Sequence, residues 1–148
     1  MKVREAQSRD IAAWAAMRAR LWPDADAAEL ADELPSMLTD TTLWNFILTS
    51  TGDRAVGFAE VQLRTMFDGC VVAPYPHIEG LWVDAELWRM GGARALLAAI
   101  EERARRRGHD RIGSDVELDN ETSQAWHEKC GFNEEVRTIL YSKPLRAR

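Results

Sequence analysis

The sequence has few residues of the kinds that bind metals or form disulfides. It contains two cysteines, Cys70 and Cys130, which are too far apart to form a paired metal-ligand motif. Free thiols in a reducing cytoplasm are therefore the expected state of both. The three histidines, His77, His109 and His127, also lack the close spacing of metal ligands. We expect a cytoplasmic protein without a metal.

Other absences exclude broad classes of protein. No apolar run approaches the length of a membrane span, and the opening MKVREAQSRD has no apolar region typical of a signal peptide. No repeat, linker or low-complexity segment divides the 148 residues, so we expect one domain over 1–148. The net charge of −5 argues against nucleic-acid binding and is compatible with a cationic substrate.

An acidic series begins like a calcium-binding loop but does not continue as one. Asp115, Glu117 and Asp119 alternate as the first ligands of an EF-hand do. The pattern then requires Gly at its sixth position and Glu at its twelfth, where this chain has Asn120 and Trp126. Metal binding is therefore not expected here either.

Apolar periodicity and turn residues predict alternating strands and helices. The expected strands span 2–5, 44–49, 55–64, 77–83, 111–117 and 136–142. The expected helices are one capped by Ser8 and ended by Pro23, one over 27–38 that Pro35 can kink or split, one over 91–107, and one from 120 to 130 capped by Asn120 or Asp119. The residues 51–53 read as a hairpin turn and 66–76 as a loop.

The most informative stretch is an apolar strand, residues 77–83, followed closely by Gly91, Gly92 and a long helix. Such a helix start presents unpaired backbone N–H groups and the positive end of the helix dipole, which suit a pyrophosphate. The stretch has the wrong spacing for a Rossmann fingerprint and lacks the ending of a P-loop. A coenzyme site is the first interpretation, and a plain surface turn is the alternative.

This stretch resembles motif A of the GNAT acetyltransferases, [QR]-x-x-G-x-[GA], which cradles the pyrophosphate of acetyl-CoA. The matching residues are Trp88, Arg89, Met90, Gly91, Gly92 and Ala93, with Trp in place of the usual leading Gln or Arg. The resemblance implies an α/β GNAT fold, a mixed twisted sheet with helices on both faces. It also implies acetyl-CoA as co-substrate, held by Leu81, Trp82, Val83, by residues 88–93 and by Arg94.

Two acidic residues interrupt the predicted central strands, where carboxylates are uncommon. Glu79 lies within 77–83 and Asp115 within 111–117. On neighbouring strands they would share one wall of a cleft, where they could bind an ammonium group and accept its proton. For each residue alone, an exposed or salt-bridged structural role remains open. Together they favour a catalytic site.

The GNAT resemblance continues through the next helix to Gly131 and Phe132. His127 stands where many family members have the Tyr proposed to protonate the departing thiolate, although a packing role for the ring remains open. Asn120 is expected to hydrogen-bond the pantetheine or pyrophosphate arm of the coenzyme.

Within the superfamily, the chain most resembles the aminoglycoside 6′-N-acetyltransferases. The resemblance rests on the segments RARLWP at 18–23, GFAE at 57–60, LRTMFDGC at 63–70, EGLWV at 79–83 and SD at 114–115. It implies acetylation of the 6′-amine by direct attack in a ternary complex, antibiotic resistance and a homodimer. The substrate residues it implies are Trp22, Met66, Glu79, Asp115 and Glu135, of which Asp115 is the candidate base.

The sequence departs from that family at two positions. Met66 and Val136 occupy places where relatives have Tyr and Glu, and Glu135 could substitute for the latter. Two alternatives stay open. One is a GNAT enzyme acting on another small amine or a protein N-terminus, and the other is a silent acyl-CoA-binding module, which Trp88 would favour.

Overall fold

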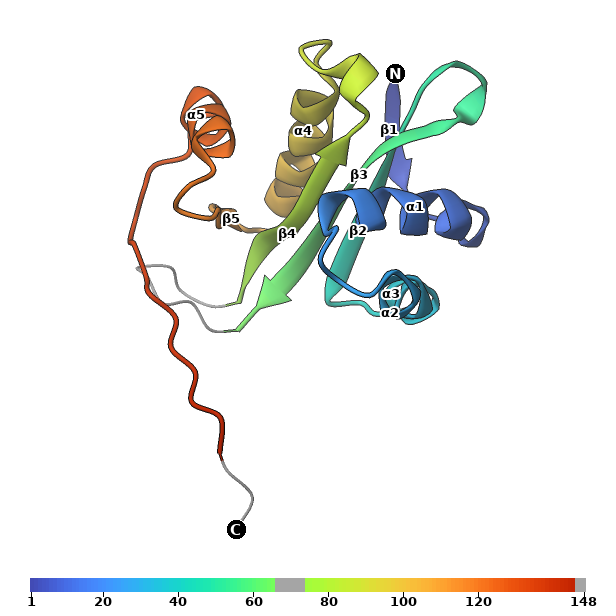
Figure 1. Cartoon of the computed structure of the whole chain (residues 1–148). Coiled ribbons are helices and arrows are strands. Elements are labelled where there is room, and N and C mark those ends of the chain that lie inside the picture. The colour runs from blue at the N-terminus through green and yellow to red at the C-terminus, as the bar shows by residue number, and fades with distance from the viewer. Residues whose placement is uncertain (66–73, 146–148) are drawn as a thin grey trace.

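The computed structural model describes residues 1–65 and 74–145 (Figure 1). The strands are β1 (Lys2–Glu5), β2 (Leu43–Thr49), β3 (Ala55–Arg64), β4 (Tyr75–Val83) and β5 (Gly113–Ser114). The α-helices are α1 (Ile11–Leu21), α2 (Ala27–Asp32), α3 (Leu34–Met37), α4 (Gly92–Arg106) and α5 (Glu121–Lys129). Short 3-10 turns η1 (Ser8–Asp10), η2 (Thr51–Asp53) and η3 (Ala85–Leu87) lie between them. None of the helices in the described part of the chain is both long and apolar enough to cross a membrane.

The strands form one mixed sheet in the order β1-β2-β3-β4-β5. The first four are antiparallel neighbours, while β5 pairs with β4 in parallel, the chain having passed through α4 between them. Helix α4 covers one face of the sheet, and α1, α2 and α3 cover the other (Figure 1). This confirms the predicted mixed sheet with helices on both faces.

Strand β2 illustrates how two cores form from one run of apolar residues. Successive side chains of a strand point to opposite faces. Phe46 and Leu48 therefore join the core beneath α4, whereas Ile47 joins Trp14 and Phe58 beneath α1. A strand buried on both faces is rich in apolar residues, as β2 is apart from Asn45 and Thr49.

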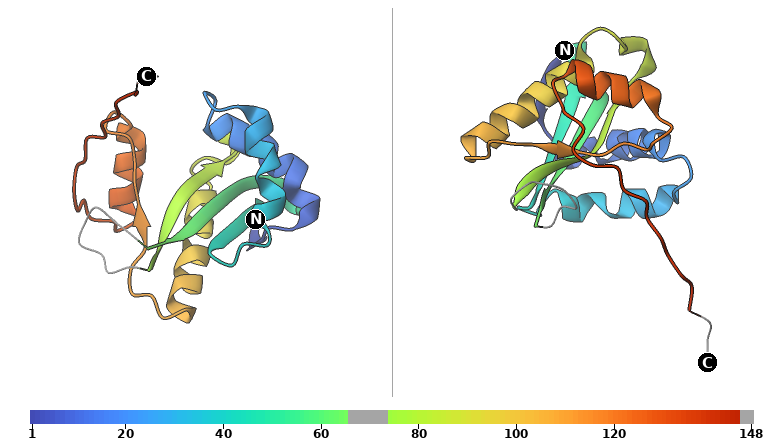
Figure 2. Two further views of the ribbon diagram at one scale, coloured as in Figure 1. Left: turned by 90° about the horizontal axis from the view of Figure 1, so that it is seen from below. Right: turned by 90° about the vertical axis from the view of Figure 1, so that its left-hand side faces the viewer.

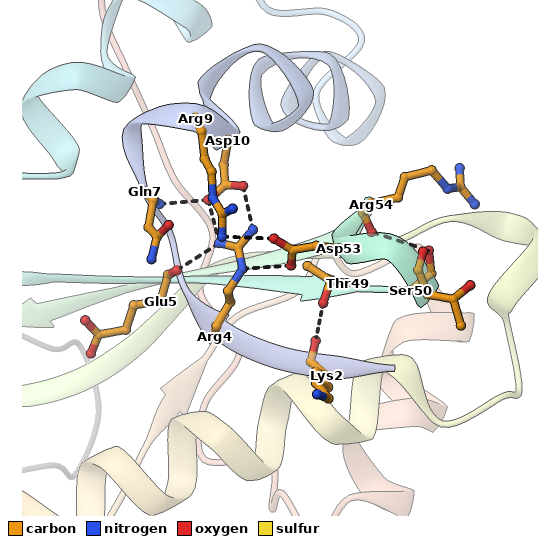
Figure 3. Close-up of polar contacts among 11 residues, drawn as sticks. Lys2, Arg4, Glu5, Gln7, Arg9, Asp10, Thr49, Ser50, Asp53 and Arg54 are labelled. Atoms are coloured by element: carbon orange, nitrogen blue, oxygen red, sulfur yellow. Dashed lines mark hydrogen bonds and ion pairs between the residues drawn. The ribbon is translucent and has the colours of Figure 1, made fainter.

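An ion-pair cluster fixes the start of the chain to the rest of the sheet (Figure 3). Arg4 on β1 donates to both oxygens of Asp10, at 2.7 and 2.8 Å, and to Asp53 in the β2–β3 turn, at 3.2 Å. Asp10 is 5% exposed, and it also accepts from the backbone N–H of Gln7. Strand β1 is thereby joined to the turn before α1 and to the hairpin.

Gln7 and Asp10 also correct the predicted start of the first helix. The N-cap of η1 is Gln7, whose side chain takes part in a reciprocal cap with Asp10, so Ser8 does not cap this helix. The expected split at Pro35 is confirmed, because α2 ends at Asp32 and α3 begins at Leu34. The turn at 51–53 is confirmed, with Gly52 at φ +74°.

The largest differences between the predicted and the observed elements lie toward the end of the chain. The strand expected at 136–142 is absent from the described residues, where 133–145 instead form an exposed irregular tail that leaves the body of the protein (Figure 1). The strand expected at 111–117 shortens to Gly113–Ser114, which leaves Asp115 beyond its end. The loop expected to reach Pro76 ends earlier, because β4 begins at Tyr75, and its residues 66–73 lie outside the described chain.

Candidate acetyl-transfer site

The start of α4 has the geometry of an anion cradle. Gly91 caps the helix at φ +88°, and a Cβ built on it would have no neighbour within 4 Å. Gly92 packs against the sheet, where a Cβ would approach Leu48 Cδ2 to 2.8 Å and Val83 Cγ1 to 3.1 Å. The helix therefore begins close to the end of β4, with its first N–H groups facing open space. Such a helix start can bind a phosphate.

Of the residues around the cradle, Trp88 has a structural role, whereas Arg89 and Arg94 provide positive charge. Trp88, at the position where motif A has Gln or Arg, is 67% exposed, and its indole N–H donates to the Val83 carbonyl at 3.0 Å. The indole thus fixes the turn between β4 and α4. Arg89 and Arg94 are exposed and make no ion pair with any residue in the described ranges, so both cations can face a pyrophosphate.

One edge of β4 is open beside this cradle. Strand β5 pairs with β4 only at His77 and Ile78, so β4 has no sheet neighbour on that edge from residue 79 onward, within the described chain. The N–H of Asp84 donates to Val56 on β3, at 2.9 Å. Because N–H direction alternates along a strand, the N–H groups of Leu81 and Val83 point to the open edge.

The two predicted carboxylates, Glu79 and Asp115, both face the guanidinium of Arg64, which lies between them. Glu79 is the extra residue of a β-bulge, since Glu60 pairs with Gly80 while Val61 pairs with Ile78. Arg64 donates to both carboxylate oxygens of Glu79 at 2.7 Å each.

The same guanidinium also faces Asp115. Arg64 Nη2 lies 3.8 Å from Asp115 Oδ2, and the Asp115 side chain is 72% exposed. The juxtaposition expected from the sequence is therefore present, but Glu79 already has a cationic partner. Asp115 is the more accessible anion for a substrate.

His77 is fully buried next to the acidic cluster, which consists of Glu79 and Asp115 with Arg64 between them. Its Nδ1 is 3.4 Å from Glu79 Oε1, and its Nε2 is 3.9 Å from Asp115 Oδ2. Burial alone would raise the pKa of Glu79, but the adjacent His77 and Arg64 outweigh it and lower the pKa to about 2. Glu79 is consequently ionised at neutral pH and is a weak base.

Trp22 lies over the bulge from the other side. A Cβ on Gly80 would meet Trp22 Cη2 at 2.7 Å, so the indole rests directly on this glycine. The guanidinium of Arg18 lies 5.2 Å from the indole centroid. Arg18 is itself buried and pairs with Glu60 at 3.0 Å. Trp22 is thus a half-buried ring that packs on Gly80, the chain neighbour of Glu79, and against Arg18.

His127 connects α5 to β5. Its Nε2 lies 2.9 Å from Ser114 Oγ, and its Nδ1 lies 2.7 Å from the Ser123 carbonyl oxygen. The ring also contacts Trp126 and Phe132 at centroid distances of 5.1 Å each. His127 therefore lies beside the point where β4 and β5 separate.

The arrangement of cradle, open strand edge and acidic cluster agrees with the comparisons with known proteins. The family model described as "Acetyltransferase (GNAT) family" matches residues 11–132. The chain belongs to the GNAT acetyltransferase family.

Relatives of this GNAT acetyltransferase share one description. It is 36% identical to the aminoglycoside N(6')-acetyltransferase type 1 of Stenotrophomonas maltophilia, over 97% of this chain and 93% of the relative. It is 32% identical to the protein of that name from Serratia marcescens, over 90% and 92% of the two chains.

Solved structures agree. AAC(6')-Iy in complex with the bisubstrate analogue CoA-S-monomethyl-acetylneamine has a TM-score of 0.90 and 28% identity, covering 97% of this chain and 98% of its own. The apo AAC(6')-IG from Acinetobacter haemolyticus has a TM-score of 0.90 and 25% identity, covering 99% and 100%.

GNAT enzymes use acetyl-CoA, and AAC(6')-Iy has also been solved with CoA. The residues present in this GNAT acetyltransferase fit that group. The open space above Gly91, the free N–H groups at the start of α4 and the cations Arg89 and Arg94 suit a pyrophosphate. The N–H groups on the open edge of β4 suit the amide-bearing pantetheine arm.

Other expected site residues are placed less centrally. Asn120 caps α5 by accepting from the N–H of Ser123 at 3.0 Å, so its side-chain oxygen is engaged in the cap. Glu135 is exposed after α5 and lies 3.9 Å from Arg111, with no contact to the Glu79 cluster. Met66 lies outside the described residues.

Sequence reasoning missed three residues of the site, namely Arg64, His77 and Ser114. Arg64 reaches Glu79 only because the β3–β4 register places the end of β3 beside the bulge. His77 and Ser114 gain their partners from elements far along the chain. The one local signal was a histidine within a largely apolar strand, which is an uncommon residue at a fully buried position.

Proposed function

We propose that this GNAT acetyltransferase acetylates the 6′-amine of aminoglycosides by direct attack in a ternary complex with acetyl-CoA. The observation that carries the proposal is the likeness, over 97% of the chain, to AAC(6')-Iy, whose structure holds an analogue that joins CoA to an acetylated neamine. An analogue of both substrates in one molecule is compatible with transfer inside a single cleft.

The acidic cluster supports a cationic acceptor. Asp115 is exposed at the end of β5, beside the open edge of β4, and can bind an ammonium group and accept its proton directly or through water. Glu79 stays ionised, and with Arg64 it fixes the charge pattern of the cleft wall. Trp22 offers an aromatic face to a sugar ring.

The N–H groups of Leu81 and Val83 suit the carbonyl oxygens of the acetyl and pantetheine groups. An oxyanion that develops during attack at the thioester is stabilised by such backbone donors. Residues of α4 and the turn before it, Gly91 and Arg89 among them, would hold the pyrophosphate. Trp88 donates to the Val83 carbonyl and so anchors the turn, which gives a structural reason for its departure from motif A.

The first test compares neomycin with paromomycin, which carry an amine and a hydroxyl at the 6′ position. Thiol release from acetyl-CoA with neomycin alone is the expected result. Equal release with both drugs would move the reaction to another amine, and silence with both would leave a GNAT enzyme of another substrate or a binding module. Asp115→Asn should lower turnover far more than acetyl-CoA affinity, and an equal loss in both would remove Asp115 from its role.

Acetylation removes a positive charge that a polycation uses to bind ribosomal RNA. We therefore propose antibiotic resistance as the cellular consequence, in the cytoplasm where ribosomes lie. Expression in a susceptible bacterium should raise the inhibitory concentration of neomycin, while the Asp115→Asn variant should not.

We also propose that the enzyme is a homodimer, formed through its C-terminal tail. Ile139, Leu140, Tyr141 and Leu145 are between 74% and 90% exposed, which is unfavourable for a tail that remains in water. Figure 2 shows the tail leaving the body on the side of β5 and α5. Light scattering should give twice the chain mass, and deletion of residues 134–148 should give a monomer.

A further inference from the structure

Ser114 and His127 form a hydrogen-bonded pair whose proton positions follow from their partners. The Ser123 carbonyl can only accept, so Nδ1 of His127 carries the proton in their 2.7 Å contact. In the neutral ring, Nε2 is then an acceptor, and the hydroxyl of Ser114 donates to it across 2.9 Å. The backbone carbonyl thus sets the tautomer of the ring, as a second group does for a catalytic histidine.

The pair lies where the two strands separate. Ser114 is the last residue of β5 that pairs with β4, opposite Ile78. Directly beyond it begins the open edge of β4, with the N–H groups of Leu81 and Val83. Asp115, the candidate acceptor of the amine proton, is the next residue along the chain. Ser114 therefore lies at the end of the paired segment, next to the open edge of β4 along which acetyl transfer would occur.

His127 itself has no free N–H to offer in this arrangement. Its Nδ1 is engaged by the Ser123 carbonyl, and its Nε2 is covered by Ser114 Oγ. The Ser123 hydroxyl lies 3.4 Å from Nδ1, and the ring makes edge-on contacts with Trp126 and Phe132. A proton on Nε2 is in contact with the Ser114 hydroxyl, which is the hydrogen-bond partner of that nitrogen.

We propose that Ser114 is a catalytic residue that protonates the departing thiolate of CoA, and that His127 acts through it as the proton reserve. The proposal rests on the proposed function, because it concerns the same transfer reaction. It differs from direct donation by the residue at position 127, and it predicts dependence on the hydroxyl.

The amine nitrogen forms a bond to the thioester carbonyl carbon, and the carbon–sulfur bond breaks with its electron pair left on sulfur. In the protonated ring the hydrogen bond of the neutral ring is reversed, so Nε2–H donates to Ser114 Oγ and the hydroxyl proton is available to the sulfur. Ser114 gives that proton to the sulfur while the His127 imidazolium gives its Nε2 proton to Ser114 Oγ, which leaves the neutral Nδ1–H ring. The amine loses two protons in all. One restores the imidazolium through solvent and the other is released.

Three variants and a matched control test the kinetic consequence. Single-turnover release of CoA with neomycin should slow about 100-fold in Ser114→Ala, the lower range for loss of general acid catalysis. Ser114→Thr, which keeps a hydroxyl, should recover most of that rate. His127→Gln keeps a polar atom near Ser114 but cannot titrate. His109→Gln, which removes a histidine packed against Trp44, should behave as wild type.

The pH profile separates a proton role from a structural one. Proton delivery through the pair predicts that the wild-type single-turnover rate falls toward alkaline pH. That alkaline limb should be absent from His127→Gln, whose residual rate should be flat there. A structural role alone would lower the rate in this variant but leave the limb in place.

A second readout uses the protein without any substrate. With three histidines in the chain, ring ¹⁵N spectra can be assigned from the variants His127→Gln and His109→Gln. His127 should show the Nδ1–H tautomer, and its Nε2 signal should shift in Ser114→Ala while that of His109 does not. An Nε2–H tautomer would overturn the proposal.

Three kinetic or chemical outcomes would also overturn it: a wild-type rate in Ser114→Ala, an alkaline limb that survives in His127→Gln, or an acetylated Ser114 peptide found after mixing with acetyl-CoA. The last would instead assign Ser114 as a nucleophile. If wild type releases CoA with neomycin and these outcomes occur, the proton relay fails and the proposed function stands. Wild-type silence with neomycin would overturn both.

Discussion

Gly91 and its neighbour Gly92 allow a sharp test of the coenzyme site, because their surroundings differ. Gly91 has a φ of +88° and open space where a side chain would project. Gly92 faces the sheet, with Leu48 Cδ2 2.8 Å from the position of a Cβ. Gly91→Val therefore adds volume at the start of α4, whereas Gly92→Ala adds volume inside the core.

The two changes should cost similar stability for different reasons. A side chain in the left-handed region costs about 1–2 kcal/mol, and a β-branched one more, so Gly91→Ala accompanies Gly91→Val as the milder change. Overpacking at Gly92 costs about 1–3 kcal/mol. For a chain of this size each kcal/mol lowers the melting temperature by about 2–4 °C, so all three variants should remain folded at 25 °C.

Gly91→Val and Gly92→Ala should differ in their effect on the affinity for acetyl-CoA. Gly91→Val places a branched side chain where the pyrophosphate would approach the helix N–H groups, and acetyl-CoA affinity should fall at least about tenfold, or ~1.4 kcal/mol. Gly92→Ala retains its N–H and points its methyl group at the sheet, so its affinity should stay within about threefold of wild type.

Isothermal titration calorimetry with acetyl-CoA, alongside thermal melting, measures both quantities. A folded Gly91→Val variant that binds acetyl-CoA as tightly as wild type would refute the placement of the pyrophosphate at this helix start. Equal weakening in Gly91→Val and Gly92→Ala would also refute it, because it would attribute the loss to general destabilisation.

The remaining predictions concern the acidic residues and the substrate wall. Burial raises the pKa of Glu60 from 4.5 to about 7, so the native state holds its proton more tightly than the unfolded chain does. The free energy of unfolding should therefore fall as pH rises from about 4.5 to about 7, by up to about 3 kcal/mol, and Glu60→Gln should remove that slope in urea titrations. Arg4→Leu should lower the free energy of unfolding by about 1–3 kcal/mol because it leaves a buried carboxylate without its donor, whereas Arg9→Leu, at an exposed pair, should cost about 0–1 kcal/mol. Gly80→Ala should displace the indole of Trp22 and raise KM for neomycin roughly tenfold with unchanged acetyl-CoA affinity, and an unchanged KM would remove that ring from the substrate wall.

Most of the fold was predictable from local patterns. The strand β3 was predicted at the residues it occupies, and α4 to within one residue at each end. Both follow from side-chain periodicity and from turn residues such as Gly52, which depend on near neighbours in the chain. The strand expected at 136–142 was wrong, because apolar alternation indicates a strand without indicating a partner for it.

The site was predictable in its residues but not in its contacts. Glu79 and Asp115 were expected together, and both do face one guanidinium. Glu79 is not a free carboxylate available to bind an ammonium group, because Arg64 donates to both of its oxygens. That contact depends on the register of β3 and β4 and on the bulge at Glu79, neither of which a local pattern specifies.

The sequence by itself determined most of the elements, the glycine-led helix start and the presence of acidic residues near the end of the central strands, because these depend on residue types within a few positions of one another. Only the tertiary structure decided that Arg64 neutralises Glu79, that His77 is buried between two carboxylates, and that Ser114 meets His127. These pairs join residues on different strands and helices. Their distances are set by sheet register and helix packing, which arise from the whole core and not from any one segment.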